Sequence, residues 1–186
     1  MTLHKACLKG NEDMVKVLCK FGALTNQSSN NGFSPLHFAC DIGHTKITEI
    51  LIQTGVAIDK VHESGQTPLQ CACDNMHNEI AKLLLDSGAV ENSSDTHGRT
   101  SLHSAAEDGN TDLIKLLIDH NADVNLTCNY RHNEKANVLL ENSADVNDHD
   151  EDGRTSLFSA AENGNIVHIK ILIEHDADVN FQKIME

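Results

Sequence analysis

Large aromatic side chains and positive charge are both scarce in this sequence. Tryptophan is absent and aromatic residues make up only 3% of the chain, which excludes a core built on large aromatic anchors. Lys and Arg total 14 against 28 Asp and Glu, so the formal net charge is −14. Nucleic-acid backbones and anionic membrane surfaces both require clustered positive charge. The composition therefore argues against binding to nucleic acid or to a membrane.

Long apolar segments are also missing. No stretch approaches the roughly 18–20 unbroken apolar residues of a membrane span, and residues 1–5 contain no apolar signal core. We therefore expect a protein of the cytoplasm or the nucleus, where the six cysteines stay free thiols. Hydrophobic residues at 39% and charged residues at 23% are typical of a globular chain rather than a disordered one.

A repeat of 33 residues runs through the chain. Four leucines stand 33 residues apart and a fifth follows 55 residues later, which is 33 plus 22: Leu3, Leu36, Leu69, Leu102 and Leu157. The segments around three of them are alike, because residues 34–39, 67–72 and 100–105 read SPLHFA, TPLQCA and TSLHSA. A second apolar segment recurs with the same step, at residues 17–19, 50–52, 83–85, 116–118 and 171–173. Such a period is the signature of a repeat architecture.

Each repeat carries the signals of two short helices. Ser and Thr side chains stand where the first helix would be capped, at Ser34, Thr67, Thr100 and Thr155. Proline follows at two of these caps, in the first helical position, where a missing N–H costs nothing. Glycines such as Gly43 and Gly55 are expected to end the first and second helices in the left-handed conformation.

The period and the T-P-L-H-x-A motif resemble the ankyrin repeat over nearly the whole chain. The resemblance implies an all-α fold, an ankyrin-repeat solenoid of helix–turn–helix units with projecting β-hairpin loops. We assign residues 1–125 to repeats one to four, the first of which lacks its N-terminal hairpin. Residues 126–147 match only the second half of a repeat and are predicted to form a truncated repeat without its first helix. Residues 148–186 are predicted to form the final repeat, with no clear C-terminal cap.

No motif in the chain predicts catalysis, a metal or a cofactor. Cys7, Cys40 and Cys73 are 33 residues apart, so they occupy one place in stacked repeats about 10 Å apart. That separation is too large for a disulfide or a shared zinc ion, and we interpret the three as small buried residues. Metalloprotease, nucleophile-elbow and phosphate-loop motifs are absent, so we expect no enzyme activity and no small-molecule substrate. The resemblance implies a structural role for the motif histidines, which would bridge a capping hydroxyl and the neighbouring loop: His4, His37 and His103.

The resemblance also implies how the chain would act, since hairpin tips and first helices line one concave face of an ankyrin array. We predict a non-enzymatic module that binds a partner protein there. The predicted contact residues are Leu8, Phe33, Ile42, Gln66, Asp74, Arg99, Glu107, Asp152, Arg154 and Glu162. Phe33, Ile42 and Leu8 would form an apolar hot spot, and the acids would favour a partner with a basic segment. Two alternatives stay open: an ankyrin fragment of a larger protein, such as an enzyme, channel or ubiquitin-ligase adaptor with its effector domain elsewhere, and, less favoured, an intrinsic enzyme.

Three similar segments end in asparagine eight residues after a leucine: Leu117–Asn125, Leu139–Asn147 and Leu172–Asn180. Each contains Asp-Val-Asn and is similar to the pattern that cytosolic asparaginyl hydroxylases modify in ankyrin proteins. A second interpretation, which we prefer, is a hairpin-turn asparagine whose side chain bonds to the backbone. Asn147, in the truncated repeat, is the favoured target if modification occurs.

Overall fold

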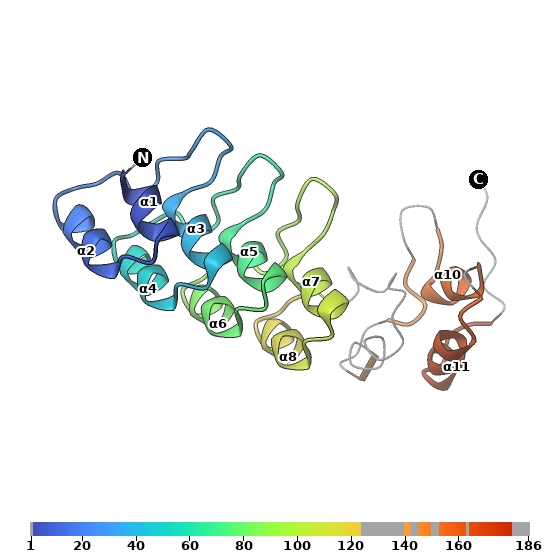
Figure 1. The fold of residues 1–186 in the computed structure, drawn as a ribbon. Coiled ribbons are helices and arrows are strands. Elements are labelled where there is room, and N and C mark those ends of the chain that lie inside the picture. Colours follow the sequence, from blue (N-terminus) through green and yellow to red (C-terminus); the bar gives the residue numbers. More distant parts are fainter. Residues whose placement is uncertain (1, 124–139, 142–144, 150–152, 163, 180–186) are drawn as a thin grey trace. The chain divides into compact units, whose positions relative to one another are not determined.

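Short helices joined in pairs by tight turns make up this protein (Figure 1). The computed structural model describes residues 2–123, 140–141, 145–149, 153–162 and 164–179. Their helices are α1 (Thr2–Leu8), α2 (Glu12–Lys20), α3 (Pro35–Ile42), α4 (Thr45–Gln53), α5 (Pro68–Asp74), α6 (Asn78–Asp86), α7 (Ser101–Asp108), α8 (Thr111–Asp119), α10 (Ser156–Glu162) and α11 (Ile166–Glu174). The chain divides into two compact units, Met1–Ala105 and Ala106–Glu186. The predicted all-α array of helix–turn–helix units is confirmed.

Side-chain caps begin the first helices where the sequence predicts them. The Ser34 hydroxyl accepts from the backbone N–H of His37, and the His37 ring in turn accepts from the N–H of Ser34. Thr67 and Gln70 form the same reciprocal pair at the start of α5. Each box satisfies two backbone donors that have no partner inside the helix.

Left-handed residues end the helices, mostly at the predicted glycines. Gly43 follows α3 with φ +88°, and Asn121 and Asp176 take the place of glycine after two second helices with φ of +67° and +64°. Asn and Asp tolerate this conformation better than other side chains. Met76 is an exception that the sequence did not predict: it occupies the place of Gly43 in the next repeat with φ +57°.

The first unit consists of two rows of helices. α3 packs between α1 and α5, while α4 packs between α2 and α6. The motif leucines fill the core between the rows, and Leu36 and Leu69 are at most 1% exposed. Cys7, Cys40 and Cys73 are completely buried, so their prediction as small buried residues is confirmed. The rows can approach closely because these sites carry small side chains.

The second unit has its own small core. Buried residues from α10, α11 and the loops beside them form it: Val146, Ala160, Leu172 and Ala177. Leu140, Leu157 and Ile169 pack against this cluster while partly exposed. No helix in the described ranges is both long and apolar enough to cross a bilayer. Most of the predicted truncated repeat, 126–147, lies outside the described residues, so its missing first helix remains a prediction.

Long loops project from the first-helix row of the first unit (Figure 1). Two backbone bonds close each loop near its tip: Ser29 N–H donates to the Phe33 carbonyl at 2.8 Å and Gly32 N–H to the Ser29 carbonyl at 3.0 Å. His62, Gly65 and Gln66 repeat the pattern in the next loop. The predicted hairpins are therefore tight turns, and in the described part of the chain they contain no continuous strand. Neighbouring loops bond to each other, since Thr96 N–H donates to the Ser64 carbonyl at 3.1 Å.

Candidate functional site

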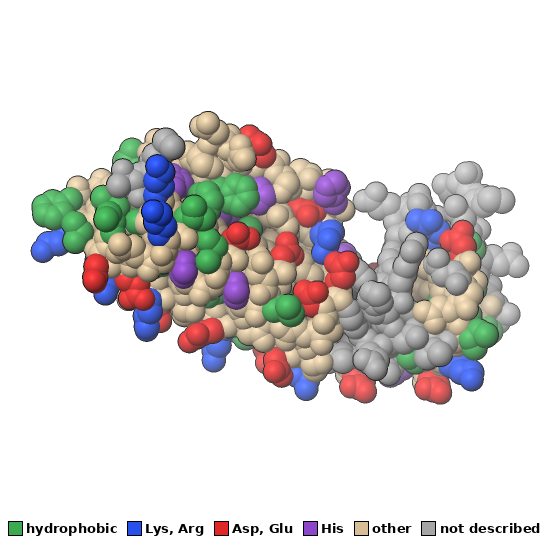
Figure 2. All heavy atoms as spheres, in the orientation of Figure 1, with side chains coloured by type: hydrophobic (Ala, Val, Ile, Leu, Met, Phe, Trp, Pro, Cys, Tyr) green, Lys and Arg blue, Asp and Glu red, His purple; other side chains and the backbone are tan. Residues whose placement is uncertain are grey.

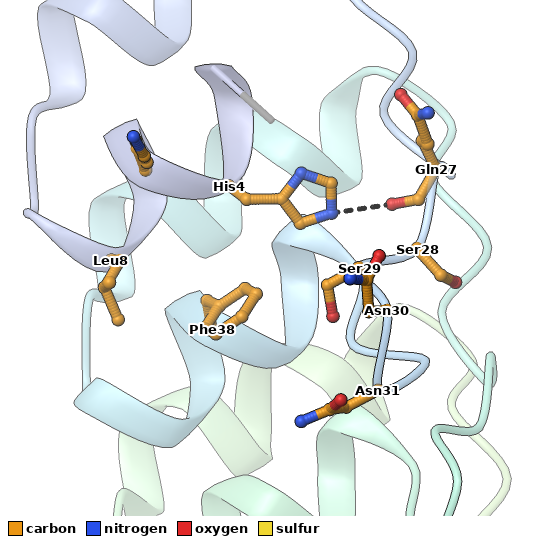
Figure 3. Close-up of a pocket in the computed structure, with 9 residues that line it drawn as sticks. His4, Leu8, Gln27, Ser28, Ser29, Asn30, Asn31 and Phe38 are labelled. Atoms are coloured by element: carbon orange, nitrogen blue, oxygen red, sulfur yellow. Dashed lines mark hydrogen bonds between the residues drawn. The ribbon is translucent and has the colours of Figure 1, made fainter.

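A pocket of about 450 Å³ lies between α1 and α3, the first two helices of the first-helix row, and the loop that joins their repeats (Figure 3). Leu8 of α1 and Phe38 of α3 supply its apolar wall, and Lys5 is the one Lys, Arg, Asp or Glu side chain among the described residues that line it. The remaining lining comes from His4 and from polar loop residues: Gln27, Ser28, Ser29, Asn30 and Asn31. The His4 Nε2 lies 2.8 Å from the Gln27 carbonyl oxygen, which ties the loop to α1. The pocket thus combines an apolar wall with a rim of hydrogen-bonding groups, the usual composition of a binding site.

An aromatic cluster borders this region. The Phe33 ring stacks on His62 with centroids 4.2 Å apart and planes within 8°, and it lies 5.4 Å from Phe38. His37 meets the same ring edge-on at 5.7 Å. Phe33 is half-buried and its ring is held by the stack on His62, while its role as a partner contact stays a prediction. The partner ring belongs to the next repeat, which the sequence around Phe33 gives no means of recognising.

His37 holds the loop of the following repeat in place. Its Nδ1 accepts from the backbone N–H of Ser34 at 3.1 Å, so the other nitrogen, Nε2, carries the proton. Nε2 donates to the Gln66 carbonyl at 3.1 Å. Gln70 does the same in the next repeat, since its Oε1 accepts from Thr67 N–H and its Nε2 donates to a loop carbonyl 29 residues on. The bridging role that the resemblance implied is confirmed for His37.

Only a neutral His37 ring can both accept from Ser34 and donate to Gln66, so the stability of the folded protein depends on pH. Burial lowers the pKa of His37 from 6.5 to about 4, because the charged ring would be desolvated. A histidine whose pKa is lower in the folded state than in the unfolded state makes its full contribution to stability at pH values above the unfolded pKa. For His37 this contribution is lost as pH falls through 6.5 toward 4. We expect the free energy of unfolding to fall by roughly 3 kcal/mol over this range, since each unit of pKa difference corresponds to about 1.4 kcal/mol.

The measurement is denaturant unfolding of the wild type and of His37→Gln at a series of pH values between about 7 and 4. Glutamine can make the same two bonds without titrating, so the wild type should lose stability relative to His37→Gln as pH falls and should become the less stable of the two near pH 4. Parallel profiles for the two proteins would contradict this assignment.

A chain of polar contacts crosses the first helices beyond the pocket. The Asp74 carboxylate accepts from Gln66 Nε2 at 2.7 Å and from the Ser104 hydroxyl. On the neighbouring pair of helices, Asn75 Nδ2 donates to the Asp41 carboxylate at 3.1 Å. Both acids are exposed, and their side chains are fixed by neighbours rather than free to rotate. The surface therefore presents negative charge in a set position.

The structure distributes the predicted contact residues over both units. Leu8 and Ile42, at the ends of α1 and α3, are 48% and 39% exposed. Phe33, Gln66, Asp74 and Arg99 belong to the same unit. Glu107, Arg154 and Glu162 belong to the second unit, and Asp152 lies outside the described residues. His4, Lys5 and Phe38 line the pocket but were not predicted as contacts, although Phe38 is large where other repeats have Cys71 and Ser104.

The buried thiols have little chemical reactivity. Burial raises the pKa of Cys7, Cys71 and Cys73 to about 12, and it raises the pKa of Cys40 as well. The thiolate is the nucleophilic and metal-binding form of cysteine. These side chains therefore contribute packing to the core.

Asn147 belongs to a row of side chains that connect successive loops. Its Oδ1 accepts from the backbone N–H of Asp178 at 2.6 Å. Asn26 and Asp59 accept in the equivalent way from the backbone N–H groups of Ala57 and Val90, each donor lying 31 residues after its acceptor. This geometry supports the turn-asparagine interpretation for Asn147, while its hydroxylation stays a prediction. Asn125 and Asn180 lie outside the described residues.

Comparison with known proteins agrees with this architecture. The family described as ankyrin repeats (3 copies) matches residues 1–62, 43–128 and 126–183. The crystal structure of the human ASB11 ankyrin repeat domain is similar at a TM-score of 0.81 and 27% identity, covering 99% of this chain and 87% of that one. The crystal structure of the Bcl-3 ankyrin repeat domain has a TM-score of 0.90 at 23% identity, covering 98% and 89%, and shows likeness of fold alone. No curated protein sequence matches this chain.

Proposed function

Because the chain belongs to the ankyrin repeat family, whose repeats are a protein–protein interaction fold, we propose that it binds a partner protein through the concave surface of its first unit. Ankyrin repeat domains are generally non-catalytic interaction modules. The chain would act by holding its partner, without chemistry of its own. The partner would contribute an apolar side chain and a basic segment.

The pocket beside α1 and α3 carries this proposal. Its wall of Leu8 and Phe38 would accept an apolar side chain, and the exposed Ile42 on the same helix row would extend the apolar contact. Figure 2 shows hydrophobic side chains gathered over this end of the first unit. A few side chains that fill well-packed, desolvated pockets supply most of the binding energy in protein interfaces.

Acidic groups further along the row would select a basic segment. Asp41, Glu63 and Asp74 are exposed there, and Figure 2 shows acidic side chains spread beyond the hydrophobic ones. Complementary charge mainly raises the association rate and fixes the register of binding. Gln66 and Arg99, whose carbonyls close the turns of two neighbouring loops, would border the same segment. In the second unit, Glu107, Arg154 and Glu162 remain proposed contacts.

The test uses a random peptide library displayed on phage and selected on the purified chain. A selected peptide, labelled with a fluorophore, is titrated against Leu8→Ala and Ile42→Ala. We expect each substitution to weaken binding about tenfold, which corresponds to the loss of one well-placed apolar contact. Asp41→Asn should instead slow association and flatten its dependence on salt.

Val90→Ala is the matched control for Leu8→Ala, because Val90 is also 48% exposed but lies in a loop after α6. Melting curves for all variants separate binding from folding. A peptide whose affinity falls as much with Val90→Ala as with Leu8→Ala would contradict the proposed surface. So would a peptide whose affinity is unchanged by both Leu8→Ala and Ile42→Ala.

A further inference from the structure

The outer face of α2 exposes an apolar stripe that the proposed binding surface does not use. Met14, Val17 and Phe21 are 45%, 54% and 81% exposed, and their spacing of three and four residues places them on one side of the helix. Leu24, directly beyond the helix, is 71% exposed and continues the stripe. Large apolar side chains grouped in this way mark an interaction surface more often than chance exposure.

Equivalent positions in the next two repeats show what kind of surface this is. Ile47 of α4 and Ile80 of α6 hold the place of Met14, and each is only 1% exposed. The second helices pack side by side, α4 against α2 and α6 against α4. The place of Met14 is therefore one that this fold covers with another helix. The shape of the stripe suits a helix rather than an extended peptide.

Charges beside the stripe indicate which helix would fit. Asp13 and Lys20 are seven residues apart, about two helical turns, so they flank the same edge of the stripe roughly 10 Å apart. A second α2 running antiparallel would place its Lys20 opposite Asp13 and its Asp13 opposite Lys20. A parallel helix would instead place this charged edge opposite the other edge of the stripe, where Leu18 lies and the charges have no partner. The pattern is thus complementary to itself in the antiparallel direction only.

We propose that two copies of this chain associate through α2, in an antiparallel two-fold dimer that buries Met14, Val17 and Phe21 against their counterparts. In such an interface the same surface of both copies is used, so each favourable charge pair occurs twice. The concave surface stays clear of this contact, because α2 belongs to the other row of helices.

Sedimentation equilibrium over a range of concentrations tests this with the whole chain. The wild type should show a monomer–dimer equilibrium. Phe21→Ser should raise the dissociation constant of the dimer about tenfold or more. Ile166→Ser is the matched control, since Ile166 is 66% exposed on α11 of the second unit and should leave the equilibrium unchanged. Both side chains are exposed, so melting curves recorded at concentrations where the wild type is monomeric should barely move.

Charge reversal then tests the antiparallel geometry. Asp13→Lys alone and Lys20→Glu alone should each weaken self-association, because both copies then oppose like charges. Mixing these two variants should restore dimers, and the double variant should dimerise by itself. A wild type that stays monomeric at all concentrations, or a mixture of the single variants that stays monomeric, would overturn the proposal.

Discussion

Gly65→Ala should lower the free energy of unfolding by about 3 kcal/mol. Gly65 has φ +80°, and a Cβ there would lie 2.9 Å from the backbone nitrogen of Thr96 in the next loop. A left-handed alanine costs roughly 1–2 kcal/mol, and forcing apart two packed backbones adds a cost of about 1–3 kcal/mol. The clash cannot be relieved by a rotamer change, because the atom that it meets belongs to the main chain. Urea unfolding of wild type and variant measures the loss.

Gly98→Ala separates the two costs. Gly98 occupies the same place in the following loop with φ +75°, and no described atom comes within 4 Å of a Cβ built there. This variant should therefore lose only the conformational part, about 1 kcal/mol. Equal losses in the two variants would show that close packing between loops contributes nothing at Gly65.

Removing the His37 side chain has an effect of similar size, and its replacement by glutamine should rescue it. His37→Ala deletes the acceptor for Ser34 N–H and the donor to the Gln66 carbonyl, and it leaves a cavity beside Phe33. Each lost buried hydrogen bond costs about 1 kcal/mol, and the cavity adds at least as much again. We expect a total of about 3 kcal/mol at neutral pH, measured by denaturant unfolding.

His37→Gln should stay within about 1 kcal/mol of the wild type, because Gln70 makes both bonds in the next repeat. If glutamine is as damaging as alanine, then the ring contacts of His37 with Phe33 and His62 carry the stabilisation rather than its hydrogen bonds.

These two positions also determine the geometry of the proposed binding surface. The bonds of His37 and Gln70 hold the Gln66 and Arg99 carbonyls of two loops, and Gly65 lets successive loop tips approach each other. The backbone of these loops is therefore restricted to one conformation. A constrained surface loses less conformational entropy when it binds, so variants that loosen the loops should weaken partner binding even where they do not touch the partner.

The sequence by itself determined the repeat unit and the places of its helix caps. The 33-residue period, the capping residues Ser34 and Thr67, and the buried leucines depend on contacts within one repeat or on a pattern common to all of them. Local rules for capping and periodicity describe such features well. The same holds for Asn121 and Asp176 in place of glycine.

The tertiary structure decided the features that depend on two repeats at once. The stack of Phe33 on His62 and the Asp74 bond to Ser104 join side chains 29 and 30 residues apart, and the pocket beneath loop 27–31 joins Leu8 and Phe38 of neighbouring repeats. Stacking brings position n of one repeat near position n+29 to n+34 of the next. Which of those side chains then meet depends on rotamers, loop angles and the size of each neighbour. The sequence therefore determined the repeating backbone that carries the surface, and the packing of neighbouring repeats determined which side chains meet on it.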